Sequence, residues 1–137
     1  MRYAILLAAL ACTSAKVAAP VEMQIIATGS YAAAEARQAV LAASEADYRA
    51  QWQKLIGEGE APAVDFTQNV TVFLMAGTRN TGGWRVVPAG VQIDGDTAVI
   101  DAKVQGPPPG GMTTQALTQP YAVISINQRS VKQVRWD

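Results

Sequence analysis

Hydrophobic and polar residues alternate with a period of two over most of the second half of this chain, which is the pattern of half-buried β-strands. The segment 70–76 departs from that pattern because it is apolar at almost every position, and we expect it to be a central strand. The apolar runs and the turn residues between them predict strands at 23–27, 37–41, 70–76, 84–87 with 91–93, 97–104, 121–126 and 130–136.

Two turn signals divide the middle of this pattern. Pro88-Ala89-Gly90 interrupts the strand that begins at Trp84, and because proline has no backbone donor, we expect an edge strand or a bulge there. Asp94-Gly95 has the residue types of a two-residue hairpin turn leading into the strand at 97–104. The middle of the chain is therefore predicted to form an antiparallel hairpin.

One helix is expected at about 44–56. Ser44 with Asp47 three residues later is a capping-box pattern, which marks the start of a helix. The apolar residues that follow recur at helical spacing and form one stripe for the core: Tyr48, Trp52, Leu55 and Ile56. Gly57 suits the position directly after a helix, because that position often takes a left-handed conformation.

Together these elements predict an α+β fold, either a mostly antiparallel sheet or a small sandwich of about five to seven strands with one helix. The chain has 137 residues and half of them are hydrophobic, which is enough for one domain with its own core. We expect residues 23–137 to form that domain. Residues 12–22 are small and rich in alanine, and we expect them to be a linker.

The first residues have the pattern of an export signal. Arg2 precedes a short apolar run and small residues follow it, so we expect residues 1–11 to be cleaved off. Cys12 is the only cysteine and stands where a bacterial lipoprotein carries its lipid, although Ala9 occupies the position usually taken by leucine. The alternative is an ordinary signal that is cleaved at a site as late as Ala19. Both alternatives predict an exported protein of the periplasm or cell envelope, and the first predicts a lipid anchor.

Charge and residue types argue against nucleic-acid binding and against most catalytic sites. Lys+Arg and Asp+Glu both number 11 and the basic residues are scattered, so no nucleic-acid surface is expected. The absence of histidine excludes the Ser-His-Asp triad and histidine metal sites. Cys12 belongs to the signal region, and the acidic pairs Glu58/Glu60 and Asp94/Asp96 lie in turns. We therefore expect no catalytic residue, no metal and no cofactor.

Three Gly- or Pro-rich segments between strands are the candidates for function, because loops on a rigid scaffold often carry the binding residues. They are Arg79–Trp84, Gly106–Met112 and Thr118–Tyr121. The glycines of the first segment are typical of a turn, but a cation and a large aromatic beside them are residue types enriched at binding hot spots. A place for Trp84 in the core is the equal alternative. We expect the proline run 107–109 to be a rigid crossover between strands.

These segments, in this order, resemble the C-terminal domain of the PrcB-type protease-complex subunits. The runs that carry the resemblance are Val72-Phe-Leu-Met-Ala-Gly77, Arg79-Asn-Thr-Gly-Gly-Trp84 and Thr113-Thr-Gln-Ala-Leu-Thr-Gln-Pro-Tyr-Ala122. In the family, a strand ending in Gly leads to an Arg-x-Thr-Gly-Gly-aromatic turn, and a Pro/Gly loop and a Thr-Gln…Pro-Tyr segment follow. The resemblance covers 70–126. This chain has Trp84 where tyrosine is commoner, and its Pro-Pro-Pro loop is its own.

The resemblance implies a small, exported, non-enzymatic binding subunit that associates with or stabilises a secreted protease complex. Its partner would be a secreted protease or another envelope protein, and it would contact a membrane only through lipid on Cys12. On this interpretation the partner contacts come from Arg79, Thr81, Trp84, Met112, Gln119 and Tyr121. The shape of the loops would come from Gly82, Gly83, Gly110, Gly111 and Pro120.

Three further interpretations remain open. Thr81–Trp84, Gly110-Gly111 and Pro120-Tyr121 also resemble, in chain order, the three loops of chagasin-like inhibitors of cysteine proteases, which implies that three loops form one edge against a protease. A structural envelope lipoprotein without a protease partner is the second. An enzyme that depends on Asp65 or Asp101 is the third and the least favoured.

Overall fold

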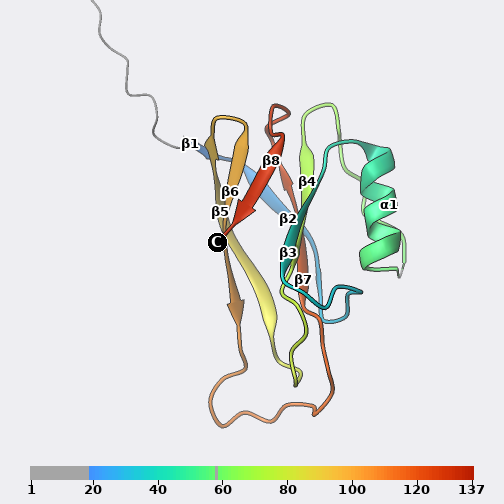
Figure 1. Ribbon diagram of the computed structural model, residues 1–137, viewed down its shortest axis with the longest axis vertical. Helices are drawn as coiled ribbons and strands as arrows, with labels where there is room; N and C mark the ends of the chain where they lie inside the picture. Colours follow the sequence, from blue (N-terminus) through green and yellow to red (C-terminus); the bar gives the residue numbers. More distant parts are fainter. Residues whose placement is uncertain (1–18, 58) are drawn as a thin grey trace, which may run out of the picture.

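The structure is a computed structural model that describes residues 19–57 and 59–137. The expected signal 1–11 and Cys12 lie outside the described residues. The elements follow the order β1 (Ala19–Val21), β2 (Met23–Gly29), β3 (Gln38–Ala42), α1 (Glu45–Leu55), β4 (Val70–Met75), β5 (Arg85–Asp94), β6 (Thr97–Gln105), β7 (Tyr121–Ile126) and β8 (Gln133–Trp136) (Figure 1). The α+β class is confirmed. The strands number one more than expected, because β1 lies within the segment expected to be a linker.

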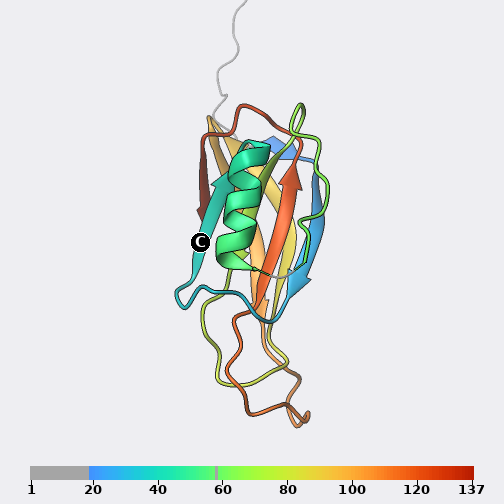
Figure 2. The ribbon, with the colours of Figure 1, turned by 90° about the vertical axis from the view of Figure 1, so that its right-hand side faces the viewer.

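The strands form two four-stranded sheets that face each other as a sandwich (Figures 1 and 2). Sheet A has the order β1-β5-β6-β8, and sheet B has the order β2-β7-β4-β3. Neighbouring strands are antiparallel except β6 and β8, which are parallel. The helix α1 covers the outer face of sheet B, so the domain has three layers.

Strand β4 is buried on both faces, which explains its continuous apolar sequence. Val70, Val72 and Leu74 belong to the core between the two sheets. Phe73 and Met75 alternate with them and belong to a second core between sheet B and α1. Because β4 pairs with β3 on one side and β7 on the other, the prediction of a central strand is confirmed.

The helix begins and ends where its sequence predicts. The Ser44 hydroxyl accepts a hydrogen bond from the Asp47 backbone N–H at 3.2 Å, and Gly57 follows the helix with a φ of 78°. Tyr48 and Trp52 are buried against Phe73, with ring centroids 5.9 Å and 6.5 Å apart respectively. Within the described residues, no helix has the length and apolar character that crossing a bilayer requires.

Strand β5 combines the edge and the bulge that Pro88 predicts. Its pairing with β6 shifts register between Pro88 and Gly90, so the strand continues through the proline to Asp94. β1 pairs only with the part of β5 from Val91 to Ile93, which leaves the outer side of residues 85–90 without a neighbouring strand in the described fold. A proline and a bulge at this position protect an open edge from pairing with another chain.

The hairpin turn between β5 and β6 differs by one residue from the prediction. Asp94 pairs with Thr97, so the two turn residues are Gly95 and Asp96 rather than Asp94 and Gly95. Gly95 has a φ of 67°. Glycine takes the first turn position because two-residue hairpins require a positive φ there.

Candidate functional site

The two long connections of the sandwich, residues 76–84 and 106–120, pair with each other at one end of the domain. We call them the loop end. The Arg79 N–H donates to the Thr118 carbonyl at 2.7 Å, the Thr118 N–H donates back at 2.9 Å, and the Gly82 N–H donates to the Thr114 carbonyl at 3.0 Å. Both connections extend beyond the sheets, at the bottom of Figures 1 and 2. Segments that are far apart in the sequence therefore form one braced unit.

Two threonines strengthen this pairing from inside the loop end. Thr118 is buried, and its hydroxyl donates to the Thr81 carbonyl at 2.8 Å. The Thr81 hydroxyl donates to the Gly82 carbonyl at 3.0 Å. Both hydroxyl protons are therefore used within the loops. The expected partner contact from Thr81 stays a prediction, and its observed role is to brace the turn.

The side chains of Arg79 and Trp84 stack on each other. The guanidinium carbon of Arg79 lies 4.6 Å from the centroid of the indole. The same ring lies against Gly106, because a Cβ on that glycine would be 3.0 Å from the ring. Trp84 is only partly exposed, so it is neither a residue of the main cores nor a free surface aromatic. It fills the space between the two connections.

The glycines of the first connection permit the close approach of the second. Gly83 has a φ of 87°, and a Cβ there would lie 2.8 Å from the Pro107 side chain. A Cβ on Gly82 would clash with the Thr114 hydroxyl. The structure thus supports the expectation that these two glycines set the shape of the loops.

The second connection, residues 106–120, carries exposed apolar side chains at and after its tip. Its tip is a turn in which the Gly111 N–H donates to the Pro108 carbonyl at 3.0 Å, and Gly110 has a φ of 78°. Met112, the next residue, is 100% exposed, and Leu117 is 62% exposed. The segment 106–120 contains no charged residue. Two large apolar side chains therefore face solvent on a braced, neutral loop.

A third connection, residues 30–37 between β2 and β3, joins the loop end through Gln119. The Gln119 N–H donates to the Ser30 carbonyl at 2.8 Å, and the Ala32 N–H donates to the Gln119 carbonyl at 3.1 Å. Tyr31, between these two partners, is 62% exposed. Sequence reasoning missed both Tyr31 and Leu117. The available signal was a large apolar residue outside any strand or helix pattern.

Pro120 and Tyr121 do not form a loop of their own. Pro120 is buried and its carbonyl accepts a hydrogen bond from the Ala76 N–H at 3.0 Å. Tyr121 is the first residue of β7 and packs partly buried in the core beside α1, with its ring over Gly29. Gly110-Gly111 and Pro120 belong to one connection, so the three motifs that carry the chagasin-like resemblance lie on two connections of the fold.

A groove of about 620 Å³ adjoins the loop end on the side of sheet A. The proline run forms part of its wall, which gives that wall a stiff backbone. The ends of β5 and β6 contribute Arg85 and Gln105, both exposed. The residues that line the groove are Gly83, Arg85, Gln105, Gly106, Pro107, Pro108 and Pro109.

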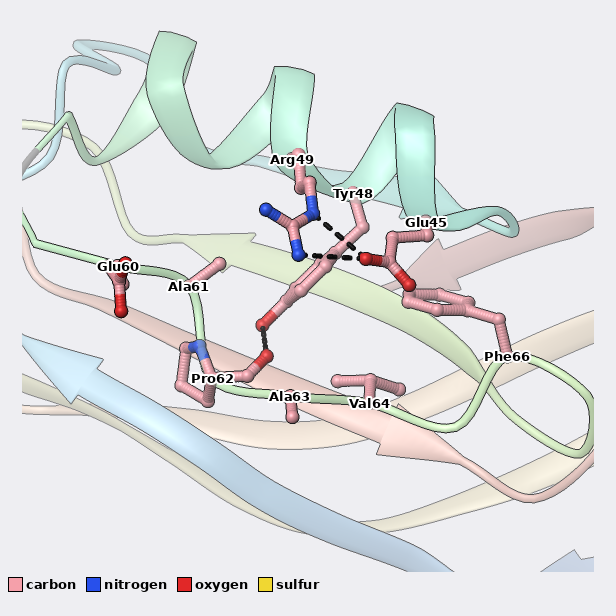
Figure 3. Close-up of a pocket in the computed structure, with 9 residues that line it drawn as sticks. All are labelled: Glu45, Tyr48, Arg49, Glu60, Ala61, Pro62, Ala63, Val64 and Phe66. Carbon is pink, nitrogen blue, oxygen red and sulfur yellow. Dashed lines mark hydrogen bonds and ion pairs between the residues drawn. The ribbon is translucent and has the colours of Figure 1, made fainter.

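A second pocket, of about 460 Å³, lies between α1 and the segment 59–66 (Figure 3). The Tyr48 hydroxyl donates to the Pro62 carbonyl at 2.7 Å, and Arg49 pairs with Glu45 at 2.8 Å. Its lining residues are Glu45, Tyr48, Arg49, Glu60, Ala61, Pro62, Ala63, Val64 and Phe66. Because these three polar groups already bind one another or the backbone, we interpret this pocket as the seam where the segment 59–66 packs on α1.

We expect Tyr48→Phe to lower the free energy of unfolding by about 1 kcal/mol at neutral pH, because the Pro62 carbonyl loses its donor. Burial raises the pKa of Tyr48 above its ordinary value of 10.0, against a smaller lowering by Arg49. The folded protein thus binds this proton more tightly than the unfolded chain does. The resulting stability is present below the unfolded pKa and is lost as the pH rises through the folded pKa.

Urea denaturation at several pH values measures this effect. Between about pH 9 and 11, the parent protein should lose more stability than Tyr48→Phe, since only the parent carries this titrating group. An equal loss in the two proteins would show that the pKa of Tyr48 does not differ between the folded and unfolded states.

The remaining candidates for chemistry do not assemble into a site. Asp65 accepts hydrogen bonds from the N–H and the hydroxyl of Thr67, which hold its pKa below the ordinary value. Asp101 is exposed on the outer face of sheet A. Among residues 19–57 and 59–137, no group of three or more acidic, cysteine or histidine side chains is placed to hold a metal ion. Glu58 lies outside the described residues.

Comparison with known protein families identifies the part of the chain that builds this end. Residues 70–127 match the family model described as PrcB C-terminal. This segment is similar to the C-terminal domain of the PrcB family. The resemblance to the PrcB C-terminal domain that the sequence of residues 70–126 indicates is therefore confirmed. No curated protein and no solved structure matches the chain.

The boundaries of the PrcB C-terminal domain correspond to elements of the fold. The match begins with β4 and ends one residue beyond β7, and it includes both connections of the loop end. β1, β2, β3, α1 and β8 lie outside the match. β2 and β3 nevertheless complete sheet B on either side of the matched strands, so the domain of this chain is larger than the matched segment.

Proposed function

We propose that this protein is an exported, non-enzymatic binding subunit that attaches to a secreted protease complex through the loop end. The observation that carries the proposal is the exposure of Met112 and Leu117 on a connection that has no charged residue. Burying such side chains against a partner is favourable, and methionine adapts its shape to the surface it meets. The PrcB C-terminal match across both connections supports the protease-complex setting.

The bracing of the loop end makes it suitable for this task. Backbone pairing between Arg79 and Thr118, and between Gly82 and Thr114, holds the connection that presents Met112. A loop that is ordered before binding loses less conformational entropy when a partner arrives. Contacts at this end would therefore add to affinity without a large ordering cost.

The signal pattern of residues 1–11 supports export to the periplasm or cell envelope, with Cys12 as the position of a lipid anchor. The partner of this protein would then be a secreted protease or a neighbouring envelope protein. The three motifs of the chagasin-like alternative lie on two connections, with Pro120 buried, which gives less support to that alternative.

Substitution of Met112 tests the proposal. The full chain with a C-terminal affinity tag is expressed in its producing cell, and proteins that co-purify from the envelope and secreted fractions are quantified. We expect Met112→Ser to lower recovery of a protease about tenfold, because an exposed apolar anchor is lost. Its melting temperature should stay unchanged, since the side chain contacts nothing that folding buries.

The control for this experiment is Ile25→Thr, which removes a second large exposed side chain at a position 49% exposed on β2. It should retain the partner. Equal recovery by all three proteins, or no protease with any of them, would contradict the proposal and favour a structural envelope role. A captured cysteine protease whose activity the protein blocks would support the inhibitor alternative instead.

A further inference from the structure

We propose that Arg79 is a carboxylate-binding site of the loop end, and that the partner docks there with an acidic group. This inference rests on the proposed function, because it names the chemistry that the partner brings to the same surface. Four observations carry it: the fixed position of the arginine, its missing acceptors, the charge of its surroundings and the geometry of its side chain.

Arg79 is held at both ends. Its backbone N–H and carbonyl pair with Thr118 at 2.7 Å and 2.9 Å. Its guanidinium lies on the indole of Trp84, and that ring is itself held against Gly106. The flexible part of the side chain is therefore already ordered, which lowers the entropy that a ligand would have to remove.

The donors of this guanidinium have no acceptor among the residues that the structure describes. Nε of Arg79 is shielded from solvent without a hydrogen-bond partner, and it is the one buried side-chain polar atom in that condition among the described residues. No hydrogen bond or ion pair joins the side chain to another described residue. Since buried polar groups in native proteins are almost always paired, a donor left in this state requires an explanation.

The surroundings supply no negative charge to balance this arginine. Arg79 is the only charged residue in segments 76–84 and 106–120. Glu35 is the nearest acidic residue along the neighbouring connection, where its backbone carbonyl accepts from the Thr78 N–H at 3.1 Å, but its carboxylate forms no ion pair with Arg79. The loop end therefore carries a partly desolvated positive charge that a carboxylate from outside can neutralise.

A carboxylate is the ligand that fits best. The planar fork of a guanidinium matches the two oxygens of a carboxylate, and such charge-assisted pairs are stronger than neutral hydrogen bonds. Arg79 is partly exposed as a whole, so the terminal nitrogens are the atoms that an incoming group can reach. Both an Asp or Glu side chain and a chain-terminal carboxylate have this chemistry, and the experiment separates them.

The experiment follows the side-chain Nε–H resonance of Arg79 by NMR in the full-length protein. Three dipeptide probes are added in turn: N-acetyl-Leu-Asp-amide, its neutral counterpart N-acetyl-Leu-Asn-amide, and N-acetyl-Leu-Leu with a free terminal carboxylate. We expect a saturable shift with the Asp probe or the free-acid probe, whichever source the site takes, and none with the Asn probe. Arg79→Gln should weaken binding of the effective probe about tenfold.

Two variants separate a binding role from a structural one. Arg79→Met keeps a long side chain over Trp84 but removes the unpaired donor, so it should lose probe binding while its melting temperature stays equal or rises. Arg135→Gln removes the same charge from an exposed position on β8, outside the loop end and its groove, and should bind the probes like the parent.

The inference is overturned if neither acidic probe shifts the Arg79 resonance, or if the Asn probe shifts it equally. It is also overturned if Arg79→Met unfolds at a lower temperature while binding an acidic probe as the parent does. These results are distinct from failure of the proposed function. A protease captured in a Met112-dependent manner by Arg79→Gln would leave the function standing and remove this site from it.

Discussion

Replacing Phe73 by alanine should destabilise the protein by about 3–5 kcal/mol, the largest effect we expect from a single substitution. Phe73 is 0% exposed at the centre of β4, and its ring contacts those of Tyr48 and Trp52 on α1. Truncation would leave a cavity between sheet B and the helix, where neither rigid layer can collapse to fill it. Urea denaturation followed by tryptophan fluorescence measures the change.

The control for Phe73 is Tyr31→Ala, which removes an aromatic ring that is 62% exposed in the connection 30–37. It should change stability by no more than about 0.5 kcal/mol. A similar loss for both substitutions would mean that the ring of Phe73 does not hold α1 on the sheet. Phe73→Leu should recover much of the stability, because most of the volume is restored.

Replacing Gly83 by alanine should cost about 1–3 kcal/mol and should also disrupt the loop end. The φ of 87° is strained for any residue with a Cβ, and the added atom would lie 2.8 Å from the Pro107 side chain. Relief of that clash requires the two connections to move apart, which breaks the pairing that presents Met112. We expect lower stability together with lower recovery of the partner.

Two glycines of the β5–β6 hairpin separate the cost of backbone strain at Gly83 from the cost of the contact with Pro107. Gly95 has a φ of 67° with no atom within 4 Å of an added Cβ, so Gly95→Ala carries the backbone strain alone, about 1 kcal/mol. Gly90 has neither a positive φ nor a neighbouring atom, and Gly90→Ala should be close to neutral. If Gly83→Ala is no worse than Gly95→Ala, the contact with Pro107 does not shape the loops.

Much of the fold follows from local patterns in the sequence. The Ser44 cap, the apolar stripe of the helix and the continuous apolar run of β4 each report an interaction within a few residues or a burial on both faces. Pro88 likewise indicates the edge and the bulge of β5 through its missing donor. These features could be predicted because each is decided by residues that lie close together in the sequence.

Other features depend on partners that lie far away in the sequence. β1 becomes a strand because β5 offers it an edge, although its three residues have no strand pattern that stands out. The parallel pairing of β8 with β6 is set by the crossing of the chain between the sheets. The pairing of Arg79 with Thr118 and the burial of Pro120 have the same origin. No local pattern encodes them.

The residue types of the candidate site could be predicted, but their arrangement could not, because it depends on partners that lie far away in the sequence. Residue types indicated Arg79, Trp84 and Met112, but their sequence context does not reveal that the first two stack and that the third is fully exposed. Leu117 and Tyr31 offered only a weak signal, a large apolar residue outside any strand or helix pattern, because single apolar residues are common on protein surfaces.

Site-specific photocrosslinking tests most directly the central claim, that the loop end binds a secreted protease complex. A photoreactive benzoylphenylalanine replaces Met112 in one protein and Asp96, in the β5–β6 turn at the opposite end of the sandwich, in the other (Figure 1). Both proteins are irradiated in the producing cell. The account predicts a crosslinked protease from position 112 and none from position 96. Crosslinks from position 96 alone, or from neither position, would contradict it.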